Sequence, residues 1–431
     1  MTYREALERL FALRRFGVRP GLDGVRAALA AVGDPHRGLS IIHIAGTNGK
    51  GSTAAFAEAV LRAAGRRTGL YTSPHLQRFT ERIRVDGAEL AQAEVAALAA
   101  RVLDAAPTAT FFEVATVMAF LAFAERGVEV VVLEAGLGGL YDSTNIVESP
   151  LATVVTGVAL DHTDVLGPTL AHVALQKAGI WKPGAPAVLA CDDAGARRLL
   201  EDEAQRVGAP AYVVGRQIEV MAEVMAGATS LGDSLVYRGP GGPLTVDRLA
   251  LAGEHQVTNA ALALAAVALA AERARWPISD EARVRGLSTA RWPGRLERIG
   301  DVLLDAAHNP DGARALARSL PRLAAGRPVT LVFGVVSDKD AAAMLAPLQP
   351  LVARVILTSP PSPRARDPET LRALAPGATV FPSVAGALDA ACAGNGLVVV
   401  AGSIFLVAEA RRLLTNEPSD PLVVQDPLQK L

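Results

Sequence analysis

The sequence predicts an α/β fold: a larger domain built on a mostly parallel sheet with a small β-hairpin region, followed by a smaller Rossmann-like α/β domain. Three observations support this prediction. Short β-branched runs alternate with helical patterns between residues 41 and 191, and the alternation resumes after residue 297. The chain has 431 residues, which is too long for one typical domain. Half of its residues are apolar, enough to bury a sizeable core.

The larger domain is expected over residues 1–290. Its strands lack polar alternation, which is typical of strands covered on both faces of a parallel sheet. The predicted strands are 41–45, 68–72, 128–133, 151–157 and 186–191, and helical patterns occupy 53–64, 89–104 and 112–126. Between residues 211 and 252, glycine and proline interrupt short apolar runs, which predicts β-hairpins. A long alanine- and leucine-rich helix follows, from residue 256 to about 273.

The smaller domain is expected over residues 297–415, after a hinge at 291–296. The boundary is placed within 286–295, because this segment contains turn-forming residues and little periodicity. The strands predicted beyond it are 302–305, 329–333, 354–358, 379–381 and 397–401. Residues 416–431 contain three prolines and are expected to form an irregular tail.

Composition narrows the class of protein. The formal net charge of −1 argues against binding nucleic acid by bulk electrostatics, and no aromatic-basic cluster supports a local basic groove. Cys191 and Cys392 lie far apart without metal-ligand spacing, which suits a reducing compartment. The N-terminus lacks the apolar core of a signal peptide, and the apolar runs 260–271 and 397–408 fall short of the about twenty residues that span a bilayer. We therefore expect a cytoplasmic protein without nucleic-acid or membrane partners.

The segment 43–53 has the parts of a nucleoside-triphosphate site. It follows the first predicted strand and precedes a helical pattern, which is the context of a phosphate loop. Glycines let the backbone approach an anion, the helix N-terminus adds partial positive charge, and Lys50 adds a full one. The strict phosphate-loop pattern has Ser or Thr directly after the lysine, whereas Gly51 intervenes here. An ordinary strand-to-helix turn is the alternative.

Polar residues follow the other predicted strands. In an open parallel sheet, ligands bind outside the carboxyl ends of the strands. Ser73 follows the second strand, Glu134 ends the third, and His162 follows the fourth within 161–164. Oxygen-rich groups suit Mg²⁺ beside nucleotide phosphates. The alternatives are a solvated or Arg-paired carboxylate at Glu134, a hydrogen-bonded loop histidine at His162 and a turn residue at Ser73.

Further candidates lie later in the chain. Lys177 is on a helix expected to begin near residue 170, where a solvated lysine is usual, although a buried lysine changes its protonation readily. Asp305, His308 and Asn309 close a strand and open a helix in the smaller domain, and helix capping is an alternative for Asp305 and Asn309. Arg295 at the hinge is placed to clamp a phosphate across the domains, or to form a linker salt bridge.

Together these motifs resemble the folylpolyglutamate synthase and dihydrofolate synthase family, a branch of the Mur ligase superfamily. They run in family order over about residues 40–405, and the glycine after Lys50 is the family's own form. The matching segments are 46–52, 72–75, 81–83, 134–139, 161–164, 177–179, 253–256 with Asn259, 293–295, 305–310 and 337–340.

The resemblance implies an ATP-dependent ligase that joins L-glutamate to the carboxylate of folate or dihydropteroate through an acyl phosphate. Its active site would lie between a P-loop ATP-binding domain and a glutamate-ligase domain. Residues implied to bind the nucleotide are Thr47, Asn48, Gly49, Lys50, Gly51, Ser52, Asn259, Arg295 and Asp305. Ser73, Glu134 and His162 would bind Mg²⁺, expected as two ions. The chain would act as a monomer.

The resemblance also assigns catalytic and substrate-binding residues. Those implied to be catalytic are Lys50, Glu134, His162, Lys177 and His308, and Lys177 matches a lysine that the family carries as a carbamate. Pterin-side contacts are implied for Thr110, Phe111, Phe112, Glu113, Tyr141, Asp142 and Ser143, and glutamate contacts for His308 and Ser403. The family commonly has Gly-Gly-Arg-Leu-Asp where this chain has Leu140 and Tyr141 before Asp142. The chain therefore lacks this one arginine, which removes a cation that the family has near the substrate.

Two other functions are compatible with parts of the sequence. A Mur-type peptidoglycan ligase uses the same chemistry, but forty N-terminal residues are too few for its usual sugar-nucleotide domain. A nucleotide-gated binding module without ligase activity would explain the glycine loop. It would not explain the cluster at Asp305 and His308 or the candidate metal ligands.

Overall fold

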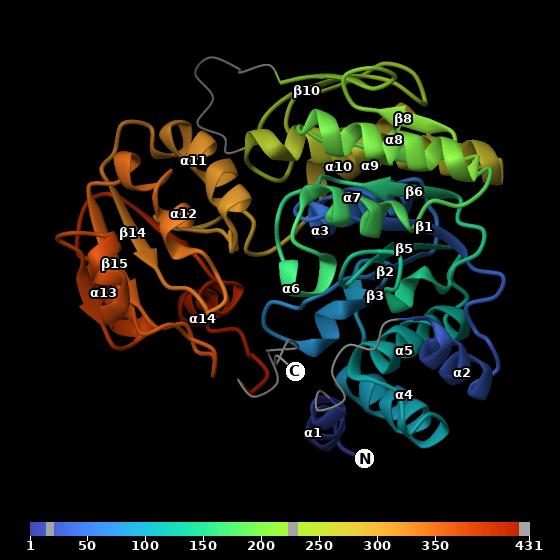
Figure 1. The fold of residues 1–431 in the computed structure, drawn as a ribbon, viewed down its shortest axis with the longest axis horizontal. Coiled ribbons are helices and arrows are strands. Elements are labelled where there is room, and N and C mark those ends of the chain that lie inside the picture. The colour runs from blue at the N-terminus through green and yellow to red at the C-terminus, as the bar shows by residue number, and fades with distance from the viewer. Residues whose placement is uncertain (14–20, 223–231, 422–431) are drawn as a thin grey trace.

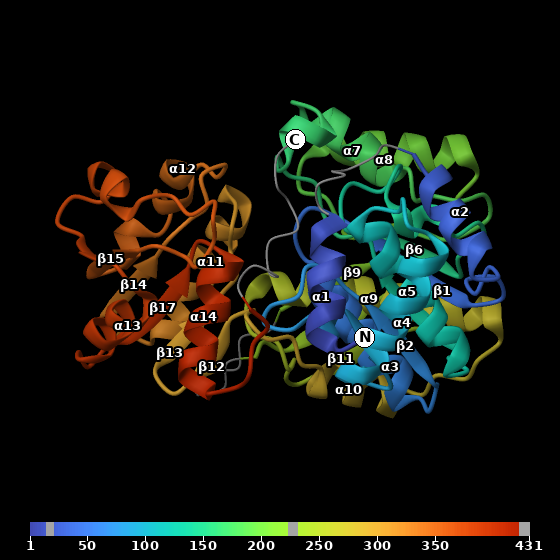
Figure 2. The same cartoon turned by 90° about the horizontal axis from the view of Figure 1, so that it is seen from below.

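The structure is a computed structural model that describes residues 1–13, 21–222 and 232–421. Two lobes lie side by side (Figures 1 and 2). The larger lobe contains an eight-stranded sheet and a three-stranded sheet, and the smaller lobe contains a six-stranded sheet. The chain crosses to the smaller lobe after helix α10 (Asp280–Thr289).

The eight-stranded sheet confirms the predicted, mostly parallel architecture. Its order is β4-β3-β2-β5-β1-β6-β7-β8, and only the β3 and β4 edge is antiparallel. The strands are β1 (Ser40–Ala45), β2 (Thr68–Tyr71), β3 (Ile83–Val85), β4 (Ala88–Glu89), β5 (Val130–Glu134), β6 (Ala152–Val155), β7 (Ala187–Leu189) and β8 (Ala211–Val213). The sequence did not predict β3 and β4, which are too short to show a period.

Helices cover both faces of this sheet, so its central strands are buried on both sides. Ile41 packs into one core and Ile42 into the other, because side chains alternate along a strand. One face carries α3 (Lys50–Ala63), α9 (Glu254–Ala274) and α10; the other carries α1 (Tyr3–Ala12), α2 (Asp23–Ala31), α4 (Gln92–Ala105) and α5 (Phe111–Glu125). The helices α6 (Thr163–Leu166), α7 (Leu170–Ala178) and α8 (Ala194–Val207) follow β6 and β7.

Helix α10 corrects one expectation, since residues 286–289 are helical although the segment 286–295 showed little periodicity. The hinge expected at 291–296 begins after this helix. Helix α9 corrects a second expectation. With 21 residues it is the one helix among the described segments long and apolar enough to cross a membrane, but most of it is buried inside the larger lobe.

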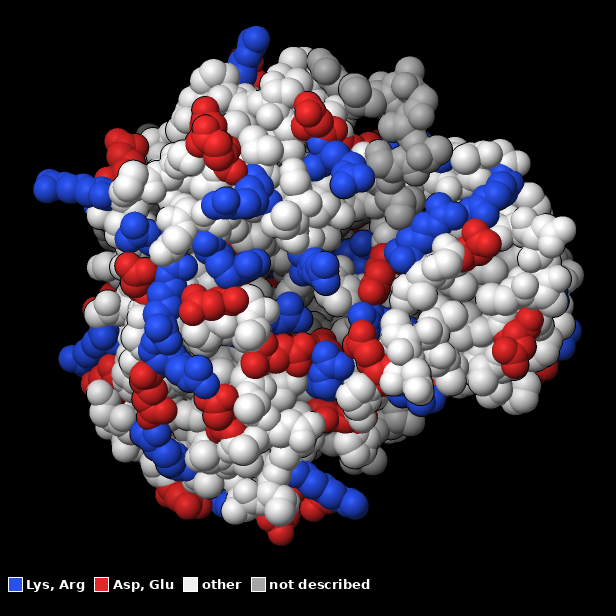
Figure 3. All heavy atoms as spheres, turned by 180° about the vertical axis from the view of Figure 1, so that it is seen from behind, with Lys and Arg blue, Asp and Glu red and all other residues white. Residues whose placement is uncertain are grey.

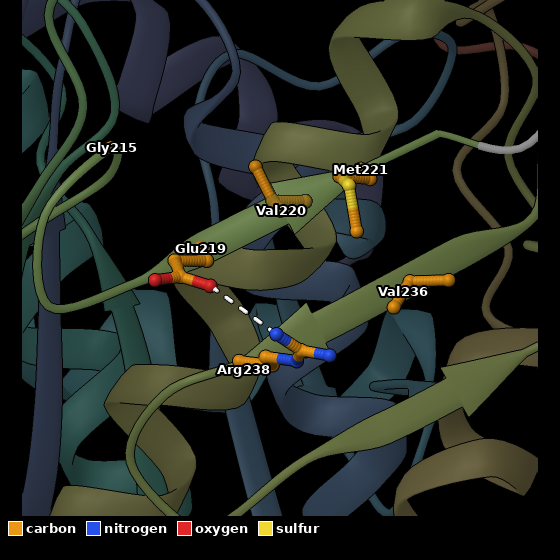
Figure 4. Close-up of a pocket in the computed structure, with 6 residues that line it drawn as sticks. All are labelled: Gly215, Glu219, Val220, Met221, Val236 and Arg238. Atoms are coloured by element: carbon orange, nitrogen blue, oxygen red, sulfur yellow. Dashed lines mark ion pairs between the residues drawn. The ribbon is translucent and has the colours of Figure 1, made fainter.

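Most of the predicted hairpin region forms a separate antiparallel sheet of β9 (Glu219–Met221), β10 (Leu235–Arg238) and β11 (Leu244–Val246). Its first segment, β8, instead pairs in parallel with β7 in the eight-stranded sheet, which corrects the prediction for residues 211–213. A shallow hollow lies on its outer side (Figure 4). Glu219 and Arg238 face each other across the hollow at 3.9 Å, and Val220, Met221 and Val236 supply its apolar wall. The expected hairpin region also includes residues 223–231, which lie outside the described residues.

The smaller lobe is a mostly parallel sheet of order β12-β13-β17-β14-β15-β16, with one antiparallel edge strand. Its strands are β12 (Glu297–Ile299), β13 (Val302–Leu304), β14 (Val329–Phe333), β15 (Arg354–Thr358), β16 (Thr379–Phe381) and β17 (Leu397–Ala401). Its α-helices are α11 (Pro310–Ala324), α12 (Ala341–Leu345), α13 (Val384–Cys392) and α14 (Ile404–Thr415). All five strands predicted here are present.

The chain returns to the larger lobe after α14. Residues 416–421 form no helix or strand, as expected, and the rest of the predicted tail, 422–431, lies outside the described residues. The Asp420 carboxylate accepts hydrogen bonds from the Tyr3 hydroxyl at 2.8 Å and the Phe79 N–H at 2.6 Å. This segment therefore ties the smaller lobe to the first helix of the larger one.

We predict that Gly286→Ala destabilises the larger lobe. A Cβ at Gly286 would lie 2.5 Å from the Val60 nitrogen, so α10 and α3 would have to separate. We expect a loss of about 1–3 kcal/mol in the free energy of unfolding, measured by urea denaturation. Gly195→Ala in α8 is the matched control, because its Cβ would approach only an Asp193 oxygen at 3.3 Å. Equal stability of the two variants would contradict the prediction.

Candidate active site

The loop between β1 and α3 has the backbone geometry of an anion cradle. Gly46 and Gly49 adopt φ angles of 153° and 87°, which L side chains rarely adopt. A Cβ at Gly46 would collide with the Thr156 hydroxyl, and one at Gly49 would lie 2.5 Å from Asn259 Oδ1. Helix α3 begins at Lys50, and no side chain caps it. Its first N–H groups are thus available to an anion.

Lys50 folds back over this loop. Its Nζ donates hydrogen bonds to the carbonyl oxygens of Gly46 at 3.0 Å and Thr47 at 3.1 Å. Thr47 is held in turn by the Ala159 backbone, since its hydroxyl accepts the Ala159 N–H at 3.0 Å. The ammonium group is therefore held over the glycine loop by two backbone carbonyls.

Glu134 lies beside this loop, as predicted. It ends β5 directly opposite Ile44 of β1, and it is only 4% exposed. Its Oε2 accepts the Ser73 N–H at 3.2 Å. Burial raises the pKa of Glu134 to about 7, although the positive charges of Lys50 and Arg295 oppose this rise. Among the described residues it forms no ion pair within 4.0 Å, so the Arg-paired alternative is wrong.

His162 reaches the same site from the loop after β6. It adopts a left-handed conformation, with φ of 50°, at the start of α6. Burial lowers its pKa to about 4; the Asp161 carboxylate opposes this effect, and Lys339, His308 and Lys50 reinforce it. The imidazole is therefore neutral near pH 7 and has a lone pair for a metal ion.

Lys177 is buried rather than solvated, so the ordinary expectation for a helix lysine is wrong here. It is 2% exposed on α7. Burial lowers its pKa to about 7, and the nearby Lys50 ammonium lowers it further. A substantial fraction of Lys177 is consequently an unprotonated amine at neutral pH.

Asp161 joins the two lobes at the edge of the loop. From the smaller lobe it receives Lys339 Nζ at 2.6 Å, Asn309 Nδ2 at 2.9 Å and His308 Nε2 at 3.5 Å. Burial alone would raise the pKa of Asp161, but the hydrogen bond and charge of His308, with His162 and Lys339, hold it well below its usual range. The sequence indicates Lys339 only as part of the motif 337–340, because its partner Asp161 lies in the other lobe.

The glycine loop itself contacts the smaller lobe. The side-chain amides of Asn48 and Asn309 exchange hydrogen bonds at 3.1 Å in both directions. Asn48 also donates to Asp311 Oδ2 at 2.9 Å. Asn309 also accepts the Gly312 N–H at 2.8 Å and so caps α11. Helix capping, the alternative role for Asn309, is therefore present together with its contact to the glycine loop. The sequence did not single out Asp311.

Other predicted nucleotide contacts surround the loop. Asp305 accepts the backbone N–H groups of Leu296 at 2.9 Å and Ala307 at 3.0 Å, which ties the hinge to the end of β13. Burial raises the pKa of Asp305, and the Arg295 charge opposes the rise. Asn259 reaches the start of α3 through Gln256, which donates to Ser52 Oγ at 3.3 Å.

The predicted pterin-side residues have clear structural roles. Thr110 and Glu113 form the capping box that starts α5, and Phe111 packs in the hydrophobic core. Phe112 is only partly buried and lies against the loop at Gly136, where a Cβ would come within 2.6 Å of its ring. Their contact with a substrate stays a prediction.

The remaining substrate candidates differ in exposure. Asp142 is buried and accepts the N–H groups of Leu137 at 2.8 Å and Thr144 at 3.0 Å, while Ser143 beside it is also buried. Tyr141 is 52% exposed. Ser403 is buried and caps α14 through the Phe405 N–H at 3.2 Å.

A pocket opens beside Glu134 where the lobes meet. Ser73, Arg84 and Glu134 line it from the sheet of the larger lobe, Trp292 and Arg295 from the hinge, and Ala306 and Ile404 from the smaller lobe. The space-filling view shows charged side chains of both signs around the hollow between the lobes (Figure 3). The sequence did not predict Arg84 or Trp292, because each becomes part of a site only when the lobes meet.

Among the described residues, no group of three or more histidine, cysteine, aspartate or glutamate side chains is arranged to hold a metal ion. The predicted ligands Glu134, His162 and Ser73 include only two such side chains, and their binding of a metal ion stays a prediction. So small a set fits Mg²⁺, which takes few protein ligands and completes its shell with phosphate and water oxygens.

Comparison with known proteins identifies the family. Residues 44–267 match the Mur ligase middle domain, and residues 294–404 match the Mur ligase glutamate ligase domain. The chain is 34% identical over 430 residues to a dihydrofolate synthase/folylpolyglutamate synthase of Bacillus subtilis, covering 96% of this chain and 99% of that relative. It spans about half the length, 51% and 52%, of bifunctional folylpolyglutamate synthase/dihydropteroate synthase relatives from Haloferax volcanii and Halobacterium salinarum.

Solved structures agree with the sequence comparison. The folylpolyglutamate synthase of Mycobacterium tuberculosis, complexed with ADP and AMPPCP, matches with a TM-score of 0.87 and 33% identity over 97% of this chain and 100% of that chain. An Escherichia coli relative in complex with ADP matches with a TM-score of 0.87 and 32% identity over 96% and 98% of the two chains. The chain therefore belongs to the folylpolyglutamate synthase and dihydrofolate synthase family of the Mur ligases.

Proposed function

We propose that this protein is an ATP-dependent ligase that joins L-glutamate to the carboxylate of a pteroyl or folate substrate. The convergence of Lys50, Glu134 and His162 beside a glycine loop, facing His308 of the smaller lobe, carries the proposal. The printed names of the relatives supply the substrate class. Residues 1–290 bind ATP in this assignment, 291–296 form the hinge, and 297–415 contribute the glutamate side.

The reaction proceeds in two steps. An oxygen of the substrate carboxylate attacks the γ-phosphorus of ATP, so that an acyl phosphate forms and ADP leaves. The amine of glutamate then attacks the acyl carbon, loses a proton and expels phosphate, which leaves an amide. Lys50 and the N–H groups of the glycine loop stabilise charge on the phosphates and align them. Closure of the two lobes excludes water, which would otherwise hydrolyse the acyl phosphate.

The residues present fit Mg²⁺. Glu134 is a buried carboxylate without an ion-pair partner among the described residues, and His162 is neutral. We assign Ser73, Glu134 and His162 as the protein ligands of the expected two ions. Bound there, the metal would neutralise phosphate charge and orient the γ-phosphate.

His308 is placed at the glutamate side of the site. Its Nδ1 lies 2.9 Å from the carbonyl oxygen of Ala306, and its Nε2 faces the Asp161 carboxylate at 3.5 Å. Both ring nitrogens thus have an oxygen neighbour that holds the ring at the junction of the lobes. In this proposal His308 contacts glutamate and is the candidate base for its amine.

The remaining assignments follow the family. Thr47, Asn48, Gly49, Gly51, Ser52, Asn259, Arg295 and Asp305 contact the nucleotide in this proposal. The segments 110–113 and 141–143 contact the pterin, and Ser403 contacts glutamate. We infer that the protein acts as a cytoplasmic monomer.

The decisive experiment is a substrate panel. Dihydropteroate and tetrahydrofolate are each incubated with ATP, Mg²⁺ and labelled L-glutamate, and the labelled product and ADP are both measured. The proposal requires ADP release that depends on a pteroyl acid and on glutamate together. ATP hydrolysis that is unchanged without either would favour the nucleotide-gated module instead.

We predict that Lys50→Ala lowers ligation by at least about 100-fold, because it removes the cation at the phosphates. Glu134→Ala should have a similar effect through loss of the metal. Both variants should keep the circular dichroism spectrum of the folded protein. Lys182→Ala is the control, since this half-buried lysine lies outside the loop. Near-normal turnover of Lys50→Ala would remove the loop from the mechanism.

We predict that Glu134→Gln stabilises the metal-free protein at neutral and alkaline pH. The folded-state pKa of Glu134 is about 7, against an ordinary value of 4.5. The free energy of unfolding of the wild type therefore falls relative to that of Glu134→Gln as pH rises from about 4.5 to 7, and the difference between the two proteins is constant above that. The difference amounts to about 3 kcal/mol at pH 8. It should vanish below pH 4.5 in urea titrations with chelator. If the free energies of unfolding of the two proteins depended on pH in the same way, the raised pKa of the buried Glu134 carboxylate would be contradicted.

We propose that Lys177 carries a carbamate, because burial leaves its amine free to add CO₂ with release of a proton. Lys177→Ala should lose most activity and regain part of it with added acetate or propionate. Lys50→Ala should gain nothing from the same acids. A carbamate resonance in ¹³C NMR after equilibration with ¹³CO₂, absent from Lys177→Ala, is the direct measurement. Failure of both rescue and resonance would sink the assignment.

A further inference from the structure

Arg84 is a largely buried cation in the wall of the interlobe pocket, and the mechanism above gives it no role. It lies in the middle of β3, where Ile83 and Val85 point into one core and Arg84 points to the opposite face. There its guanidinium stacks over the Trp292 ring, with 5.4 Å between the guanidinium carbon and the ring centroid.

Trp292 places this cation beside the phosphate loop. A Cβ at Gly51 would lie 2.7 Å from the indole Nε1, so the ring packs directly on the first turn of α3. Arg84, Trp292 and Gly51 thus form one stack that runs from the sheet edge to the loop. Ser73 and Glu134, the residues assigned to the metal, line the same pocket.

The charge of Arg84 has no close carboxylate partner. Glu89 is the one acid that pairs with it among the described residues, at 3.9 Å from Nη2. Both oxygens of Glu89 already accept hydrogen bonds from Arg78, at 2.9 and 3.2 Å. Glu81, in the same pocket wall, instead accepts three backbone N–H groups from residues 76–78.

The Trp292 ring and the distant Glu89 carboxylate compensate the desolvation of Arg84 only in part. Its Nε is buried and has no hydrogen-bond partner in the described part of the chain. A buried donor without a partner costs free energy. A carboxylate offsets this cost well for a guanidinium, because the two groups form two parallel hydrogen bonds. Arg295 across the pocket adds a second positive charge. The pocket therefore favours an anionic group beside the reacting atoms.

We propose that Arg84 is a substrate-binding residue that takes the α-carboxylate of a glutamyl group in the interlobe pocket. The proposal rests on the ligase function proposed above and names a specificity residue for it. Two sources have this chemistry: the glutamyl tail of a folate substrate and the incoming free L-glutamate. Dihydropteroate has no glutamyl tail, so it separates the two.

The test compares wild type with Arg84→Gln in the full chain with ATP and Mg²⁺. KM is measured for dihydropteroate, for tetrahydrofolate and for L-glutamate with each acid. We expect the KM of a substrate that bears an α-carboxylate to rise about ten-fold or more, with little change for dihydropteroate. A rise for tetrahydrofolate alone identifies the tail, and a rise for L-glutamate with both acids identifies the incoming amino acid. Arg84→Lys, which keeps the charge, should restore part of the affinity.

Arg66→Gln is the matched control. Arg66 also stacks on a tryptophan, Trp276 at 5.6 Å, and pairs with Glu129 at 3.2 Å, but it does not line the pocket. It should leave every KM unchanged. Unaltered KM values in Arg84→Gln, or an equal rise for dihydropteroate, would overturn the inference while wild-type ligation remains. Wild type without glutamate-dependent ADP release would defeat the proposed function, and this inference with it.

Discussion

The parallel register of β1 with its two neighbours is the constraint on which the site depends. Ile44 lies opposite Glu134 of β5 on one side and Val154 of β6 on the other. The three strands therefore end at one level, and whatever follows them must meet there. The glycine loop follows β1, the loop bearing His162 follows β6, and Glu134 is itself the last residue of β5. Residues separated by more than a hundred positions become neighbours through backbone pairing alone.

This arrangement concentrates charged groups where water is excluded. Burial is the largest cause of the pKa shifts of Glu134, His162 and Lys177, and the Lys50 ammonium lowers the pKa of all three. Burial shifts each of these three toward its neutral form. Triphosphate and divalent cation would supply the missing charges together. The cost of burying these groups is thus linked to ligand binding.

The lobes meet through polar contacts that belong to the site. Asp161 receives Lys339, His308 and Asn309, and Asn48 of the glycine loop pairs with Asn309. The segment 416–421 adds a second connection through Asp420, far from the loop along the chain. The glycine loop is therefore connected directly to the smaller lobe by one pair of side-chain amides.

The sequence by itself determined the fold class, the glycine loop and the family. It also determined the positions of five of the six parallel strands described in the larger lobe and of all five described in the smaller lobe. These features depend on local patterns: apolar runs, glycine spacing and motifs that stand at strand ends. It left Lys177 open between a solvated and a buried lysine, and only the packing around α7 decided for burial. It also showed little periodicity over residues 286–289, which form the end of α10. Only the tertiary structure decided the partners of Asp161, the stack of Arg84 on Trp292 and the pocket they line. Each of these needs side chains from segments that come together only when the lobes pack, and no local pattern encodes that contact.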